Sequence, residues 1–225
     1  MKKILSLVLF LLISLVAPVS ATPSSIIWIP STDIQPTDKT HLGIDNYFTV
    51  RPLRIGQSTG AFTTPAIGLT WGAKNFEFGF DYVTSQDNPM YFNAKARLLG
   101  KKPTDLNLVA GVYNLGTTSL TNQEVKYLLG SVSTKDGTRF SLGYGIGRKK
   151  ALGNDNQMIL AAIDKQLNKK WWVGVDYQGG KSALGALNLG VAYSFTPDVS
   201  ILLGYDIYNN STYKNTMTVQ LDVNF

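Results

Sequence analysis

The sequence has 225 residues, of which 44% are hydrophobic and 16% charged, and it contains no cysteine. This balance is too apolar for a disordered chain, and the lack of cysteine excludes a disulfide framework and any thiolate metal site. The formal net charge of +6 is a mild excess that gives no reason to expect a nucleic-acid partner. No linker-like composition divides the chain, so we expect one folded unit after any targeting segment.

Residues 1–21 have the pattern of a secretory signal peptide. Lys2 and Lys3 precede an apolar run from Ile4 to Ala17. Val19-Ser20-Ala21 follows, and its small residues suit a signal peptidase. The alternative is a membrane anchor, but the apolar run is shorter than the roughly 20 residues that a spanning helix needs. We therefore expect export and cleavage after Ala21, which lowers the formal charge from +6 to +4 because Lys2 and Lys3 leave with the segment.

Residues 22–39 differ from the rest of the mature chain. The stretch "SSIIWIPSTDIQPTDK" has room for a short strand near Ile26, but Pro30 and Pro36 lack the N–H groups that a central strand donates. We expect this segment to be a periplasmic lead-in or a partial plug of the domain that follows.

From residue 40 onward, apolar residues recur at every second position. In "LNLGVAYSF", for example, Leu187, Leu189 and Val191 alternate with small or polar residues. Because side chains point alternately to the two faces of a strand, this pattern predicts two-faced β-strands. Twelve such runs follow one another: 40–50, 64–72, 76–84, 90–99, 106–115, 125–134, 139–147, 158–167, 171–179, 185–195, 199–208 and 216–225.

The connections between these runs alternate between mostly short and longer ones. An even number of strands of about 10 residues, with tight turns at one end and longer loops at the other, is typical of a transmembrane antiparallel up-and-down β-barrel. We predict an all-β fold of this kind with twelve strands over residues 40–225, with the tight turns on the periplasmic side. The alternative is a soluble β-sandwich, whose strands also alternate.

Two observations favour the barrel over the sandwich. The less apolar face is rich in Gly, Ala, Ser, Asn and Thr, whereas the solvent face of a sandwich usually carries long charged side chains. Aromatic residues also sort to both strand ends, as they do at the two borders of a membrane. At the tight-turn border we expect Trp71, Phe76, Phe140, Trp171, Phe195 and Phe225. At the other border we expect Phe48, Tyr82, Phe92, Tyr127, Tyr177 and Tyr205.

The final run, "TMTVQLDVNF", alternates Met217, Val219, Leu221 and Val223 and ends on Phe225. In this respect the chain resembles the outer-membrane β-barrels of diderm, Gram-negative-type bacteria, and it is porin-like at the level of that class. The resemblance implies a bacterial outer-membrane location, with outer-membrane lipids and the barrel-assembly machinery as partners. It also implies an assembly signal formed by Val219, Leu221, Val223 and Phe225.

No arrangement of residues predicts catalysis. His41 is the only histidine, so a histidine-based metal cluster is excluded. Barrel enzymes of the outer membrane rely on His with Ser or Asp partners placed to activate a nucleophile or water. A single histidine at a strand start fits a rim residue better, and we expect neither an enzyme nor a cofactor.

Charged residues on the inward face fall into two groups around the predicted wall. The acidic arc comprises Asp45, Asp164, Asp176, Asp206 and Asp222. The basic arc comprises Lys95, Arg97, Lys126 and Arg139, with Glu77 and Asp81 beside it. Our hypothesis is that the arcs flank a water-filled pore and create a transverse field that selects solutes. In the alternative, Glu77 and Asp81 pair with the nearby cations and the other charges only keep the lumen wet.

These observations favour a porin-like channel for passive or weakly selective diffusion of small polar solutes. The alternative is a non-conducting barrel with a structural or surface-interaction role. One further cluster, Arg148-Lys149-Lys150, lies in a predicted outer loop, where it either contacts lipid phosphates or is solvated.

Overall fold

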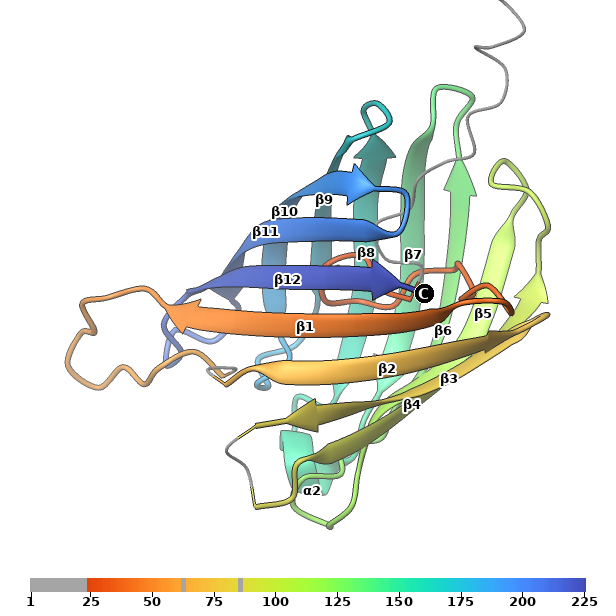
Figure 1. The fold of residues 1–225 in the computed structure, drawn as a ribbon. Coiled ribbons are helices and arrows are strands. Elements are labelled where there is room, and N and C mark those ends of the chain that lie inside the picture. Colours follow the sequence, from red (N-terminus) through yellow and green to blue (C-terminus); the bar gives the residue numbers. More distant parts are fainter. Residues whose placement is uncertain (1–23, 62–63, 85–86) are drawn as a thin grey trace, which may run out of the picture.

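The computed structural model describes residues 24–61, 64–84 and 87–225, which form a closed barrel of twelve antiparallel strands (Figure 1). The strands are β1 (Thr40–Thr49), β2 (Ala66–Ala73), β3 (Phe76–Val83), β4 (Met90–Leu99), β5 (Asn107–Gly116), β6 (Val125–Ser133), β7 (Thr138–Ile146), β8 (Gln157–Gln166), β9 (Trp171–Gln178), β10 (Ala186–Thr196), β11 (Val199–Tyr208) and β12 (Thr216–Asn224). All bounds lie within two residues of the predicted runs. The predicted all-β, twelve-stranded fold is thus confirmed.

A short helix, α2 (Lys149–Leu152), lies in the loop between β7 and β8. Among the described residues, no helix is long and apolar enough to cross a membrane. The predicted signal peptide lies outside the described residues.

The first and last strands close the barrel. Their register runs from His41 opposite Asn224 to Thr49 opposite Thr216. Thr40 and Phe225 continue the pairing, because the Thr40 N–H donates to the Phe225 carbonyl at 2.7 Å and the Phe225 N–H donates to the Thr40 carbonyl at 3.0 Å. Closure removes the unpaired strand edges that an open sheet would expose.

The barrel wall is apolar on its exposed outer face and polar on its buried inner face, which is the reverse of a soluble protein. On the outer face Leu142 is 68% exposed and Leu203 51%, whereas on the inner face Asp176 is 1% and Asp206 0% exposed. Such a continuous apolar outer surface is stable only against an apolar environment. This inversion excludes the β-sandwich, in which the apolar faces would form the core.

Strand β6 faces the opposite way from our prediction. Tyr127 points inward and is 7% exposed, and Leu128 on the outer face is 48% exposed. Because this strand carries apolar residues on both faces, its alternation does not determine which face is outside. Packing decides it: a Cβ atom on Gly111 of β5 would lie only 2.5 Å from the Tyr127 hydroxyl oxygen, so the glycine makes room for the ring.

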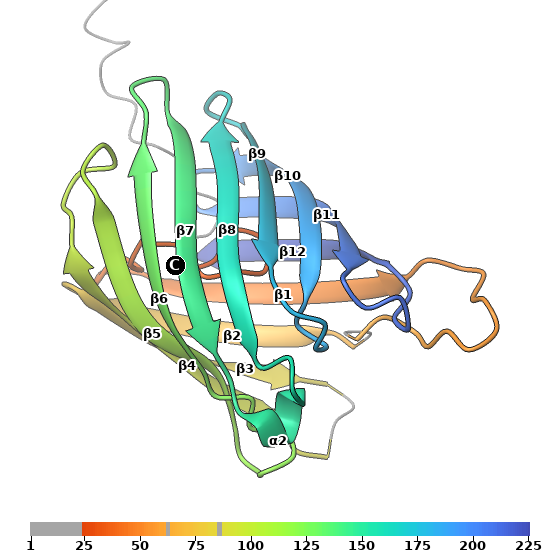
Figure 2. The ribbon, with the colours of Figure 1, turned by 180° about the vertical axis from the view of Figure 1, so that it is seen from behind.

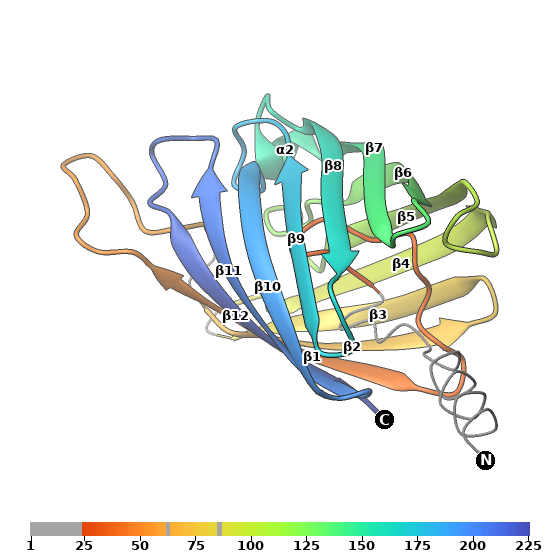
Figure 3. The same ribbon diagram turned by 90° about the horizontal axis from the view of Figure 1, so that it is seen from above.

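Residues 24–38 are here called the luminal segment; residues 24–35 lie inside the barrel (Figures 2 and 3), whereas residues 36–38 are exposed. Its first part, residues 24–31, is a tight loop that we call the luminal hairpin: Ile26 N–H donates to the Ile29 carbonyl at 2.9 Å and Ser31 N–H to the Ser24 carbonyl at 3.1 Å. The hairpin isoleucines are buried in a cluster with wall residues, among them Val109, Leu129, Leu160 and Leu202. The described part of residues 22–39 therefore packs against the inner wall of the barrel.

Candidate functional site

Asp176 on β9 holds the luminal hairpin through backbone groups. Its Oδ2 atom accepts hydrogen bonds from the N–H groups of Ile27 and Trp28 at 2.8 Å and of Ile29 at 3.2 Å, and Oδ1 accepts one from Asn188 Nδ2 at 2.7 Å. A buried carboxylate is costly without such donors. Asp176 is therefore an anchor for the hairpin and does not face an open pore.

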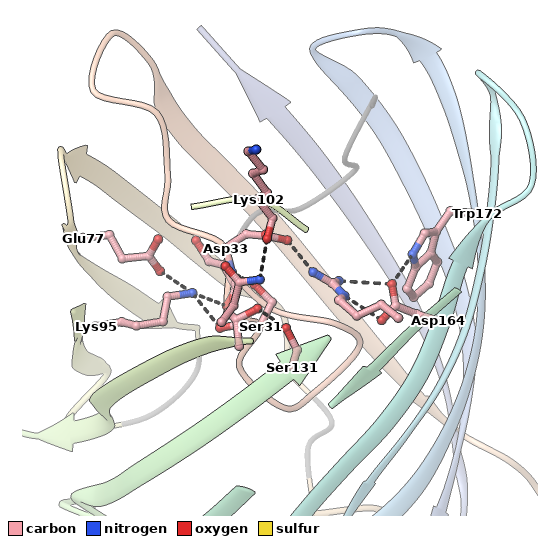
Figure 4. A network of polar contacts seen from close by, with 12 residues as sticks. Ser31, Asp33, Glu77, Lys95, Lys102, Ser131, Asp164 and Trp172 are labelled. Atoms are coloured by element: carbon pink, nitrogen blue, oxygen red, sulfur yellow. Dashed lines mark hydrogen bonds and ion pairs between the residues drawn. The ribbon is translucent and has the colours of Figure 1, made fainter. Parts of the chain in front are cut away.

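Lys95 on β4 binds the same hairpin from the opposite wall (Figure 4). Its Nζ atom donates to the carbonyl oxygens of Ser24 and Ser31, both at 3.1 Å, and lies 3.1 Å from Glu77 Oε1. The other Glu77 oxygen accepts the Gln35 N–H at 2.7 Å. Lys95 and Glu77 are 3% and 5% exposed, so the pair is fully engaged by the wall and the luminal segment.

Arg139 on β7 joins two carboxylates. It contacts Asp164 on β8 through Nε at 2.9 Å and Nη2 at 3.1 Å, and Asp33 of the luminal segment through Nη1 at 2.5 Å (Figure 4). Trp172 Nε1 also donates to Asp164, at 3.1 Å. Asp164 and Arg139 were expected on opposite arcs, but they face each other across adjacent strands, so the two arcs meet here.

Lys126 is not part of the lumen. Because β6 is turned over relative to the prediction, the Lys126 side chain lies on the outer face, is 73% exposed and contacts Glu124 at 2.9 Å. Arg97 does point inward, and its Nε atom is buried without an acceptor among the described residues. The basic arc thus reduces to Lys95, Arg97 and Arg139.

The remaining acidic residues occupy different environments. Asp206 is fully buried and accepts a hydrogen bond from Thr216 Oγ1 at 2.7 Å. Asp222 contacts Ser200 Oγ at 3.4 Å and His41 Nε2 at 3.5 Å. Asp45 and Asp222 line a cavity, whereas Asp206 does not.

The cavity has a volume of about 360 Å³ and lies between the luminal hairpin and the inner wall, which strands β1 to β6, β9 and β12 supply. It extends from loop residues such as Leu184 at the long-loop end to the Glu77–Lys95 pair near the tight turn between β2 and β3. Five charged residues line it: Asp45, Glu77, Asp81, Lys95 and Asp222. Because Glu77 and Lys95 neutralise each other, the cavity is acidic through its three aspartates.

Aromatic side chains shape the same cavity. The Trp28 ring of the hairpin packs edge-on against Tyr47 on β1 and Tyr208 on β11, with centroid distances of 6.1 and 5.6 Å. Tyr91 and Tyr113 line the wall opposite. The cavity therefore combines aromatic surfaces with a small number of charged and polar groups.

Two inward glycines give the luminal segment its space. A Cβ atom on Gly190 would lie 2.9 Å from Ile27 Cδ1, and one on Gly72 would overlap the Gln35 carbonyl. The sequence analysis did not predict the contacts between the wall and residues 24–38. The apolar, non-alternating stretch "IIWI" is the feature of the sequence that indicates a buried segment there.

Comparison with known proteins gives a fold but no family. No family model and no curated protein matches the chain. Among solved structures, the KdgM porin has 14% identity and a TM-score of 0.57 over 82% of this chain and 99% of that one. The chain has a porin-like fold. The KdgM porin in complex with disordered oligogalacturonate (13% identity, TM-score 0.57, 83% and 99% covered) and the NanC porin (12%, 0.52, 83% and 98%) are similar to it as well.

Proposed function

We propose that this protein is a channel of the bacterial outer membrane through which small polar solutes diffuse. The observation that carries the proposal is the polar cavity that runs beside the luminal hairpin inside a barrel with an apolar outer face. The likeness to solved porins supports it at the level of the fold. The same surface inversion supports contact with membrane lipids.

The charge of the cavity suggests which solutes pass. Asp45, Asp81 and Asp222 line it, and when ionised they attract cations and repel anions in a narrow, partly desolvated passage. One of the similar solved structures is the KdgM porin in complex with disordered oligogalacturonate, an anionic sugar chain. Here the three aspartates would repel such a ligand, so we propose that this channel prefers cationic and uncharged solutes.

This proposal replaces the predicted transverse field between an acidic and a basic arc. The charged groups of Lys95, Arg139 and Asp176 bind residues of the luminal segment. Among the described charged residues that line the cavity, those outside the Glu77–Lys95 pair are the aspartates on β1, β3 and β12. The field along the path is therefore one-sided and acidic.

A second function has one observation in its favour. The luminal hairpin is bonded to walls on both sides, through Asp176 and Lys95. A hairpin fixed in this way suits a non-conducting barrel with a structural or surface-interaction role.

Single-channel recording in planar bilayers separates the two functions. The full mature chain is compared with a variant that lacks residues 24–35, and detergent-extracted samples of both are first tested for heat-modifiable gel migration. Conductance steps from the full chain support the channel. A silent full chain and a conducting deletion variant support the plugged barrel, and silence from both folded proteins contradicts a channel of either kind.

A further inference from the structure

The outer face of the barrel carries a shallow groove at its long-loop end. It is formed by β6, β7 and the residues that flank them, and its lining includes Leu128, Tyr144 and Ile146. These three side chains are 44–48% exposed and belong to the apolar face that the proposed membrane location turns towards lipid. The part of the groove that these three side chains form is therefore suited to an acyl chain.

Two cations lie at the end of this groove that is nearest the long loops. Lys126 begins the lipid-facing row of β6, and Arg148 lies two residues beyond the end of β7 with a side chain that is 42% exposed. An exposed cation on a lipid face is tolerated where it reaches the headgroup layer. Lys126 and Arg148 thus mark the level of the headgroups on this side of the barrel.

Glu124 holds the two cations together. Its carboxylate lies 2.9 Å from Lys126 Nζ and 3.8 Å from Arg148 Nη1. The hydrogen bond and charge of Lys126, with the charge of Arg148, keep the pKa of the Glu124 carboxyl below its ordinary value. Glu124 also has a φ angle of 42°, a left-handed conformation that non-glycine residues rarely adopt. The carboxylate thus lies between the two cations, on a residue whose backbone conformation costs free energy.

The adjoining helix adds further positive charge. Lys149 and Lys150 are exposed in α2, and Lys150 Nζ donates to Ser119 Oγ at 2.9 Å, which ties the β7–β8 loop to the β5–β6 loop. The four cations at this end of the groove exceed its one carboxylate, so this end attracts anions even when Glu124 is ionised.

We propose that this groove binds a phosphorylated lipid of the outer leaflet, with the phosphate between Lys126 and Arg148 and an acyl chain along Leu128, Tyr144 and Ile146. The inference rests on the membrane location in the proposed function but not on conduction. A lipid fits better than a free anion, because the cations adjoin an apolar surface that faces the bilayer. In this arrangement Glu124 occupies the phosphate position in the absence of lipid and competes with it.

Native mass spectrometry of the full mature chain, released from phosphatidylcholine nanodiscs with and without phosphatidic acid, tests the proposal. The double variant Lys126→Gln/Arg148→Gln should lose about 30-fold in apparent affinity for phosphatidic acid, which is the effect expected for two cationic contacts near the surface. Glu124→Gln should bind more tightly than the wild type, because it frees both cations. All variants are first confirmed as folded by heat-modifiable migration.

Lys165 provides the matched control. It is also an outward lysine paired with a carboxylate, 2.6 Å from Asp136, but it lies near the tight turn between β6 and β7. Lys165→Gln should leave lipid binding unchanged. Equal binding by the double variant and the wild type, equal losses in both variants, or displacement of the lipid by inorganic phosphate at equal concentration would overturn the proposal. Since bound lipid is counted directly, a silent channel does not affect the result.

Discussion

Replacing Asp176 with alanine should release the luminal hairpin. The substitution removes the acceptor for three backbone N–H groups, those of Ile27, Trp28 and Ile29. A hydrogen bond to a charged group contributes about 1.5–3 kcal/mol. The three bonds share one oxygen, so we count each at about half of its usual contribution, which leaves a total of about 3 kcal/mol. That is a factor of about 150 in the equilibrium between docked and released hairpin.

Single-channel recording measures this release. Asp176→Ala should show larger or more frequently fluctuating conductance steps than the wild type, and Asp176→Asn, which keeps an acceptor oxygen, should lie between the two. Asp206→Asn is the matched control, because Asp206 is equally buried on the same side but bonds Thr216 of the wall. Wild-type steps from a folded Asp176→Ala variant, or the same change in Asp206→Asn, would refute the anchoring role.

Three further changes follow from the lumen and the closing strand. Replacing Asp45 and Asp81 together with asparagine should lower the preference for cations, measured as a reversal potential nearer zero in a salt gradient; an unchanged potential would exclude them as selectivity residues. Lys95→Met should destabilise the barrel by about 3–5 kcal/mol, because it leaves Glu77 buried without its cation. The double variant Glu77→Gln/Lys95→Met should recover part of this loss in a denaturant titration, and an additive loss would argue against the pair. Deleting Phe225 should reduce the fraction of heat-modifiable barrel in the outer membrane while leaving export intact, and normal assembly would contradict its role as a signal.

The strands were predictable because each carries its own signal. The alternation in a run such as "LNLGVAYSF" indicates which residues share a face, and the polar connections indicate where each strand ends. The same alternation placed Lys95 and Asp176 on the interior. It failed for β6, because Leu128 and Leu129 are both apolar and neighbouring packing at Gly111 decides which of them faces out.

The partners of the inward charges were not predictable in the same way. Asp176 contacts backbone N–H groups nearly 150 residues earlier in the chain. Such bonds have no spacing or residue type that a sequence reveals, because every non-proline residue carries an N–H group. The sequence therefore located the charges, whereas only the structure reveals that several of them hold a segment inside the barrel.

The most direct test of the proposed solute path uses the absence of cysteine from the chain. A single cysteine is introduced at Asp45, which lines the cavity, or at Asp206, which is buried in the wall outside it. Each folded variant is recorded before and after addition of a positively charged, thiol-specific methanethiosulfonate reagent. The proposed path predicts that the reagent reduces the current through Asp45→Cys and leaves Asp206→Cys unchanged. Block at Asp206→Cys with none at Asp45→Cys would contradict it.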